Sequence, residues 1–322
     1  MHEIWCTSRQ IKGIEIIKMV ARIKKDGDRK LSYSQYGLWK QCKRRYKLKY
    51  IDKIPVINVG TIHTIFGTAV HETIQKYLTV LYTQTKREAD LLDLNQILLD
   101  NMRSEFSKAK SKLADVGVTD QTLICSKEQM SEAYGNGVQI IKWFKNPKNQ
   151  SKFYKKRGYS LVGIEMPLEL YIRDGIYVVG FIDVIIKNES TGRILIIDLK
   201  TSKRGWSSYD KAKDEKKNQI LLYKKWYSEQ YGFPIEKIDV QFQIMRKEVN
   251  KNAEFPIPRM SRFSPSDGTV SINRAIRDFD DFVDSVFNSD GTVKLDSEAD
   301  FPKNPTKLCD YCEFFGAYCD GK

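Results

Sequence analysis

The spacing of hydrophobic positions along this chain changes near Tyr159, from helical periodicity to the apolar runs and alternation typical of strands. Before that point, LSYSQYGLWKQCKRRYKLKY, from Leu31 to about Tyr50, has aromatic and apolar residues at helical spacing and predicts a helix opened by a serine N-cap. A second helix is predicted from about His63 to Thr83. The stretch 88–146 has long helical patterns, few prolines and many lysines, and it predicts a helical insertion.

Three later segments are rich in β-branched residues and are bounded by Gly, Asn or Ser, so they predict strands. They read LVGIEMPLELYI, IYVVGFIDVIIK and RILIIDLK. A long helix is predicted from about Lys211 to Tyr231, and VQFQIM predicts a further strand. The order strand, strand, strand, helix, strand, with helices before and after, favours a layered α/β core.

The second and third strands are joined by NESTG, a turn-forming cluster that predicts an antiparallel hairpin centred near Ser190 and Thr191. That register places Asp183 opposite Asp198, with Cβ atoms about 5 Å apart, a separation at which two carboxylates can bind one divalent cation. Lys200 points to the same side, two residues further on.

The group formed by Asp183, Asp198 and Lys200 has two possible interpretations, a metal site and a simple ion pair. Buried like charges are tolerated only when they are protonated, paired or bound to metal, so a lysine and Mg²⁺ or Mn²⁺ would stabilise them. However, Asp-x-Lys tripeptides are common at strand ends, where Asp198 and Lys200 would form a simple ion pair with Asp183 at a solvated edge. A one-residue shift in register would also separate the carboxylates.

Four motifs, in this order, resemble those of the RecB-like branch of the PD-(D/E)XK nucleases. FGTAVHE at 66–72 is similar to the first motif of that family, GFID at 180–183 to G-x-x-D, IDLKT at 197–201 to (D/E)-x-K, and QILLY at 219–223 to Q-x-x-x-Y. The resemblance implies a restriction-endonuclease-like mixed sheet flanked by helices. Residues 1–30 would be an N-terminal extension, and 31–322 one nuclease domain that includes the helical insertion at 85–155.

The resemblance also implies roles for individual residues. His71, Asp183, Asp198 and the backbone carbonyl of Leu199 would hold Mg²⁺ or Mn²⁺, while Lys200 would orient or activate the attacking water. Without its motif, a lone histidine would more often be a packed or surface residue.

Other polar residues could also reach this edge of the sheet. Gln219 and Tyr223 are four residues apart and share one helix face, so both can approach the active edge. Glu165 and Glu169, on the preceding strand, would either add outer contacts to the metal or face solvent.

Three of the six cysteines form the pattern C-x₂-C-x₆-C, at Cys309, Cys312 and Cys319. Inside a cell, such clustering favours a metal or cluster site over a disulfide framework. The resemblance adds Cys42 and implies a 4Fe–4S cluster, although four thiolates also make a zinc site. Either centre would join the N-terminal helix to a C-terminal segment at 300–322. Cys6 and Cys125 are expected to be free thiols.

Basic residues predict how a nucleic acid would be held. The chain has 54 Lys and Arg against 41 Asp and Glu, a net charge of +13, which favours a polyanionic partner but is weak evidence alone. Lys203, Arg204 and Trp206 follow Lys200, where cationic groups would hold the DNA backbone and an indole would stack on a base. A second basic cluster, near Cys42, would also hold DNA or would be a solvated charge run. It consists of Lys43, Arg44, Arg45, Lys47 and Lys49.

The expected function follows from the resemblance: an exonuclease or flap-processing nuclease acting on single-stranded DNA or DNA ends in recombination, repair, phage replication or CRISPR adaptation. The alternatives are a catalytically silent DNA-binding or scaffold module and an RNA-acting nuclease of the same fold. No Walker motif is present, so unwinding would need a helicase or another recombination or CRISPR partner. The sequence has no membrane-length apolar run and no signal-peptide pattern, so we expect a cytoplasmic protein without a membrane partner.

Overall fold

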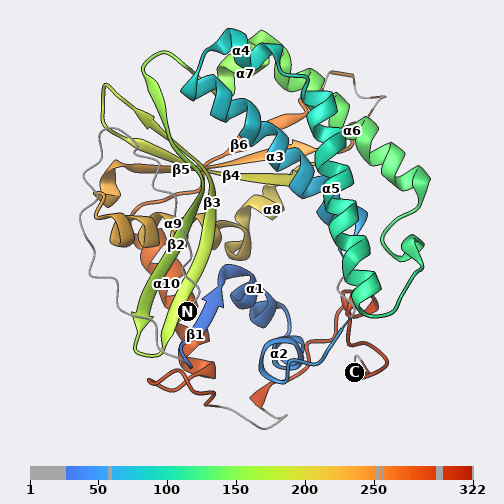
Figure 1. Cartoon of the computed structure of the whole chain (residues 1–322). Helices are drawn as coiled ribbons and strands as arrows, with labels where there is room; N and C mark the ends of the chain where they lie inside the picture. The colour runs from blue at the N-terminus through green and yellow to red at the C-terminus, as the bar shows by residue number, and fades with distance from the viewer. Residues whose placement is uncertain are drawn as a thin grey trace, which may run out of the picture.

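The computed structural model describes residues 27–56, 60–250, 252, 254–255, 257–294 and 300–320. Most of the predicted N-terminal extension, including Cys6, lies outside these ranges. Within them the chain forms a mixed α/β structure around a central sheet with helices on both faces (Figure 1). The predicted α/β fold class is therefore confirmed. None of the helices in the described ranges is both long and apolar enough to cross a membrane.

The strands are β1 (Arg29–Ser32), β2 (Tyr159–Arg173), β3 (Ile176–Asn188), β4 (Ile194–Ser202), β5 (Ile238–Arg246) and β6 (Met260–Phe263). The α-helices are α1 (Tyr33–Gln41), α2 (Lys43–Tyr46), α3 (Ile62–Thr83), α4 (Lys86–Leu91), α5 (Leu94–Asp115), α6 (Lys127–Lys145), α7 (Pro147–Phe153), α8 (Ser208–Ala212), α9 (Asp214–Tyr231) and α10 (Thr269–Val286). Shorter π- or 3₁₀-helical turns lie at η1 (Lys47–Ile51), η2 (Gln121–Leu123), η3 (Ile235–Lys237) and η5 (Cys309–Tyr311).

The sheet divides into two branches along β3. One edge of β3 pairs with antiparallel β2 over most of its length. Its other edge is shared, because β1 pairs in parallel with residues 176–179 and β4 pairs antiparallel with residues 184–187. Residues 180–183 pair with neither β1 nor β4. We call this place the fork; it lies where β3 separates from β4.

Two hydrophobic cores lie on opposite faces of the sheet. One is formed with α1, α9 and α10, and the other with α3, α5 and α6 (Figure 1). The parallel pair β4–β5 contributes to both cores, because successive residues of a strand point to opposite faces. Since α3 and α9 pack on opposite faces, their side chains can approach the fork from both sides.

Two helix predictions differ from the structure. Leu31 is fully buried and pairs with Val178, so Leu31 and Ser32 belong to a strand, and the helix begins one residue after Ser32. Ser32 is nevertheless its N-cap, as predicted. The helix ends at Cys42, which is extended, and Lys213 likewise separates α8 from α9. In these places tertiary pairing and caps override helical periodicity. The stretch predicted as a helical insertion does form helices, α4 to α7.

Candidate active site

Asp183 and Asp198 stand at the fork, one position beyond the last β3–β4 pair. That pair joins Val184 to Ile197, which agrees with the predicted hairpin register. The Asp183 carboxylate accepts a 2.6 Å hydrogen bond from the N–H of Leu199. A side-chain oxygen therefore provides the acceptor at the point where the main-chain ladder stops, and this contact holds Asp183 beside β4.

Lys200 connects the carboxylates to helix α9. Its Nζ lies 2.8 Å from Oδ2 and 3.1 Å from Oδ1 of Asp198, and it donates a 2.9 Å hydrogen bond to Oε1 of Gln219. The Gln219 amide in turn donates to the hydroxyl of Tyr223 at 3.2 Å. The helix residues predicted from sequence are thus brought together with the strand residues in one chain of contacts.

Two glycines of the sequence motifs permit close packing at the site. A Cβ on Gly180 would lie 3.1 Å from the Tyr223 hydroxyl, and one on Gly67 would lie 3.3 Å from Oγ1 of Thr201. Such distances are tighter than ordinary van der Waals contact. Gly180 therefore allows α9 to approach β3, and Gly67 allows α3 to approach β4.

His71 reaches the site from α3. Its Nδ1 is 3.9 Å from Oδ2 of Asp183, while its Nε2 is buried and has no hydrogen-bond partner among the described residues. Burial and the nearby charge of Lys200 lower the His71 pKa to about 3. The imidazole is therefore neutral near pH 7, the form in which histidine binds a metal.

Negative charge exceeds positive charge within this group. Burial and the Asp198 charge raise the pKa of Asp183 well above its ordinary value, and burial also raises the pKa of Asp198 against the effect of Lys200. Burial opposes the charge on Lys200, but Asp198 and Asp183 outweigh it and raise the lysine pKa. One ammonium thus serves two carboxylates, an arrangement that a further cation would stabilise.

The donor set has the chemistry of a divalent-metal site. Two carboxylates and a neutral imidazole suit Mg²⁺ or Mn²⁺. Asp198 Oδ2 is buried and makes its ion pair to Lys200 without a well-aligned hydrogen bond. Nε2 of His71 has no hydrogen-bond partner within the described ranges. Across the described ranges no three His, Cys, Asp or Glu side chains form a ready-made metal group. The residues therefore fit the ion by chemistry and burial, not as a closed cage.

The same site contains a contact that the sequence motifs do not reveal. Gln75 is buried, and its amide donates to Oε1 of Glu165 at 2.6 Å and to the carbonyl oxygen of Asp183 at 3.3 Å. Gln75 lies four residues after His71, so helical spacing could have indicated it. Only the fold shows which strand residues it reaches.

Comparison with known proteins agrees with this geometry. A family model of the PD-(D/E)XK nuclease superfamily matches residues 30–320. The chain belongs to this superfamily. None of the curated proteins compared with this PD-(D/E)XK chain matches it. A solved structure described as "Crystal structure of SSO0001" is 13% identical, over 91% of this chain and 86% of that one, with a TM-score of 0.33.

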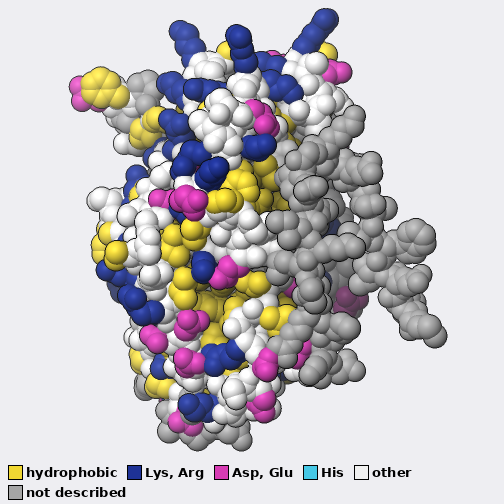
Figure 2. Space-filling model, turned by 90° about the vertical axis from the view of Figure 1, so that its left-hand side faces the viewer, with side chains coloured by type: hydrophobic (Ala, Val, Ile, Leu, Met, Phe, Trp, Pro, Cys, Tyr) yellow, Lys and Arg dark blue, Asp and Glu magenta, His cyan; other side chains and the backbone are white. Residues whose placement is uncertain are grey.

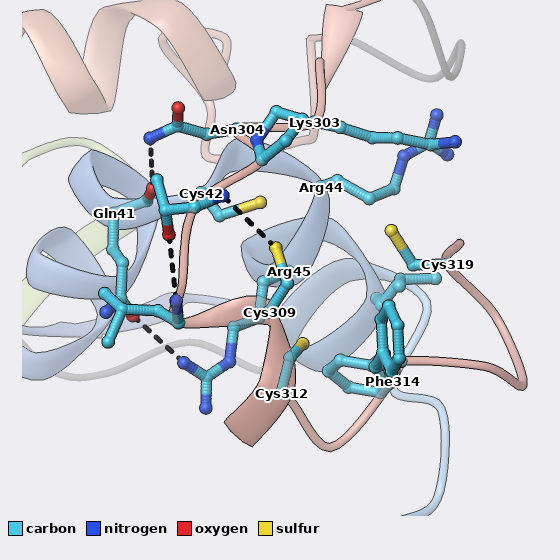
Figure 3. A pocket seen from close by; sticks show the side chains of 15 residues that line it. Gln41, Cys42, Arg44, Arg45, Lys303, Asn304, Cys309, Cys312, Phe314 and Cys319 are labelled. Carbon is cyan, nitrogen blue, oxygen red and sulfur yellow. Dashed lines mark hydrogen bonds between the residues drawn. The ribbon is translucent and has the colours of Figure 1, made fainter. Parts of the chain in front are cut away.

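The four cysteines expected to form the second centre of this PD-(D/E)XK protein line one pocket (Figure 3). The sulfur atoms of Cys42, Cys309, Cys312 and Cys319 point into the same space, and none of the four is in a disulfide. The backbone N–H of Thr306 points to the sulfur of Cys309 at 3.5 Å. Four thiols around one cavity suit a cluster or a metal ion chemically, although they do not form a closed ligand group.

Polar contacts already join the two segments that carry these cysteines. The Pro302 carbonyl accepts from the N–H of Arg44, and Asn304 donates to the Gln41 carbonyl at 2.8 Å. Glu313 pairs with both Arg45 and Lys49, at 2.5 and 3.0 Å. The C-terminal segment is therefore fixed against α1, α2 and η1 by its own contacts.

The residues predicted to bind DNA occupy different environments. Lys203 is largely exposed, 3.5 Å from Glu248, and Arg204 is also exposed. Trp206 instead packs on Phe242 and Phe263, with ring centroids 4.9 and 6.2 Å away, and Lys216 lies over its ring. The indole is thus partly buried against β5 and β6.

The basic residues near Cys42 that were predicted to bind DNA also make contacts within the protein. Arg44 is buried beside the cysteine pocket, and Arg45 is held by Glu313 and Gln41. Lys47 pairs with Asp52. These contacts give Arg44 and Arg45 a place in packing the C-terminal segment.

Proposed function

We propose that this chain is a metal-dependent deoxyribonuclease that hydrolyses phosphodiester bonds in single-stranded DNA or at DNA ends. The observation that carries the proposal is the position of Lys200, whose ammonium contacts both Asp198 and Gln219 beside the Asp183 carboxylate. Nucleases of the superfamily generally use divalent metals such as Mg²⁺. In this chain His71, Asp183, Asp198 and the carbonyl of Leu199 would hold the ion.

When bound, the ion would lower the pKa of a coordinated water and neutralise charge on the scissile phosphate. The task left to Lys200 follows from its surroundings. Two carboxylates raise its pKa, so the side chain stays protonated near neutral pH. It would therefore orient the attacking water and stabilise negative charge on a phosphate oxygen, while Gln219 keeps the ammonium in place.

Exposed positive charge supports a nucleic-acid substrate. Lys203 and Arg204 follow the last residue of β4, a short distance along the chain from Lys200, and would hold the backbone of a bound strand. Figure 2 shows further Lys and Arg side chains gathered at the end of the molecule where Figure 1 has α4 and α7. Any unwinding of duplex DNA would come from a partner protein.

The proposal also includes a 4Fe–4S cluster on Cys42, Cys309, Cys312 and Cys319, with zinc as the alternative. It is supported by the shared pocket and by the absence of disulfides among these four residues. The centre would have a structural role, because it would add a covalent link between segments that are already joined by Arg45, Lys49 and Glu313.

A cleavage panel tests the function. Single- and double-stranded DNA and RNA, labelled at either end, are incubated with Mg²⁺, Mn²⁺ or EDTA and sampled over time. We expect metal-dependent loss of DNA from one labelled end, and no cleavage by Asp198→Ala or Lys200→Ala. The matched control is Lys225→Ala, at a partly exposed position on α9 whose side chain pairs with Glu229.

The outcomes separate the alternatives. Undiminished cleavage by both site variants would refute the assignment. DNA binding without cleavage would indicate a silent binding module, and preferential degradation of RNA would indicate an RNA-acting nuclease.

A further inference from the structure

Glu165 has a backbone conformation that is rare in a strand. It lies within β2 with φ of +49°, in the left-handed region that disfavours residues with a Cβ. The neighbouring pairs Ile164–Val184 and Met166–Ile182 place it opposite Asp183. Strained residues persist where the surrounding structure fixes them, and they occur often at functional sites.

The unusual conformation coincides with a change of face in two strands. On β3, Ile182 packs in the core formed with α9, whereas Val184 packs in the core formed with α3. On β2, Met166 and Ile164 divide in the same way. Residues two apart normally share a face, so both strands rotate at the position between them. Glu165 occupies that position on β2, and its left-handed backbone accommodates the rotation.

Glu165 also takes part in the contacts that hold Asp183. It accepts the 2.6 Å hydrogen bond from Gln75, whose amide also donates to the Asp183 carbonyl at 3.3 Å. One helical turn earlier, His71 approaches the Asp183 carboxylate. Helix α3 thus contacts Asp183 at both its main chain and its side chain, and Glu165 fixes the orientation of the buried amide.

The exposure of Glu165 distinguishes it from the other carboxylates. Asp198 is 3% exposed and Asp183 is partly buried, whereas Glu165 is exposed. An exposed carboxylate beside the fork can accept hydrogen bonds from the water shell of a hydrated cation, while its other contact runs through Gln75 to Asp183.

We propose that Glu165 is a positioning residue of the nuclease site: it orients Gln75, which holds Asp183, and it strengthens binding of the divalent cation from outside the inner ligands. The strained backbone is retained because it turns β2 and β3 at this point. This inference rests on the proposed metal-dependent function.

The contribution of the Glu165 charge to metal binding is tested with Glu165→Gln. Glu169→Gln, on the same strand, is the matched control. Direct binding of Mn²⁺ to the full chain is measured by the loss of the free-ion electron paramagnetic resonance signal. We expect Glu165→Gln to weaken Mn²⁺ binding about tenfold. The half-saturating metal concentration for cleavage should rise by the same factor, with the rate at saturating metal within about threefold of the parent. Glu169→Gln should bind as the parent does.

The backbone strain at position 165 is tested by comparing Glu165→Gly with Glu165→Ala in EDTA. Both remove the carboxylate, but only glycine accepts the positive φ without strain. The glycine variant should therefore have the higher Tm, while both lose Mn²⁺ affinity equally. A residue with a merely structural role would change Tm and metal affinity together.

Each result decides between the two proposals. Parent-like Mn²⁺ affinity in Glu165→Gln would overturn the role of its charge while leaving the nuclease assignment in place. Equal Tm for the glycine and alanine variants would overturn the role of strain. A folded parent protein that neither binds Mn²⁺ nor cleaves DNA would overturn the proposed function, and this inference with it.

Discussion

The ammonium group of Lys200 donates a 2.9 Å hydrogen bond to the amide oxygen of Gln219, which joins the end of β4 to helix α9. Asp198 lies 2.8 Å from the same nitrogen, so the ammonium contacts two acceptors from different elements. Lysine is flexible, so an ammonium held between two acceptors is better positioned than one held by a single carboxylate.

Removing the Gln219 acceptor should reduce the rate of cleavage. Gln219→Leu preserves the approximate size of the side chain but leaves Lys200 attached to Asp198 alone. We expect the rate at saturating metal to fall about 10- to 100-fold, with little change in Mn²⁺ affinity. Steady-state kinetics and Mn²⁺ binding check this. Glu229→Gln, at an exposed position on the same helix, is the control, and an unchanged rate in Gln219→Leu would contradict the role of the contact.

Removing one of the two carboxylates should stabilise the metal-free protein while abolishing its activity. Asp183 and Asp198 repel each other, and burial disfavours both charges. Asp183→Asn should therefore unfold at a higher Tm in EDTA, although its cleavage rate falls by about 10³-fold or more, a trade-off common at active sites. Thermal melts with and without EDTA provide the measurement. A lower Tm in EDTA would show that its bond to Leu199 outweighs the repulsion.

The raised pKa of Asp183 should make the free energy of unfolding depend on pH in a defined direction. The pKa of Asp183 is higher in the folded chain than in the unfolded chain, so the folded state binds more protons between those two values. Its contribution to stability is present below the unfolded pKa and is lost as pH rises through the folded pKa. The difference in unfolding free energy between Asp183→Asn and the parent should therefore grow as pH rises from 4 toward neutrality. Denaturant titrations in EDTA measure it, and a difference independent of pH would contradict the raised pKa.

The two glycines Gly180 and Gly135 should respond oppositely to alanine. At Gly180 an added methyl would meet the Tyr223 hydroxyl at 3.1 Å and displace the tyrosine that contacts Gln219. We expect about a tenfold loss of activity. At Gly135, in helix α6, no described atom beyond its chain neighbours and its own helix backbone lies within 4 Å of an added Cβ. Alanine should therefore stabilise the protein by about 0.5–1 kcal/mol without altering activity. Parallel rate and melting measurements compare them, and an active Gly180→Ala would remove the reason given for this glycine.

The cysteine pocket predicts a different result for each class of cysteine. Cys42→Ser and Cys319→Ser should lose the iron and sulfide of protein purified without air, together with absorption near 400 nm, and should melt at lower temperature. Cys125 is buried in the core formed with α3, away from the pocket, so Cys125→Ser should retain the cluster. Elemental analysis and spectroscopy check this. Stoichiometric zinc in the anaerobic parent protein would identify the alternative centre.

Trp206 shows how the fold changes the interpretation of a sequence pattern. An indole among basic residues shortly after Lys200 predicts a stacking surface for DNA bases. In the fold, the ring packs between β5, β6 and Lys216. Trp206→Ala should therefore lower Tm, whereas Arg204→Ala should weaken single-strand binding at low salt and leave Tm unchanged. Affinity and melting measurements separate the two effects, and unaltered affinity of Arg204→Ala would count against its proposed role.

The sequence by itself determined the local features of this protein. Apolar periodicity predicted the main strands and the helical stretch, and the turn residues between Asn188 and Arg193 set the register that places Asp183 level with Asp198. Motif spacing placed Gln219 and Tyr223 on one helix face. These predictions hold because they depend on steric preferences and hydrogen bonds among residues close together in the chain.

Only the tertiary structure decided the relationships between distant segments. The fork in the sheet exists because β1 and β4 share one edge of β3. Leu31, predicted to be helical, lies in a strand because it pairs with β3. The tertiary structure also brought Gln75 to Glu165, ninety positions away, and the C-terminal cysteines to Cys42. Such contacts depend on which buried surfaces fit together, and periodicity along one segment contains no information about its partner.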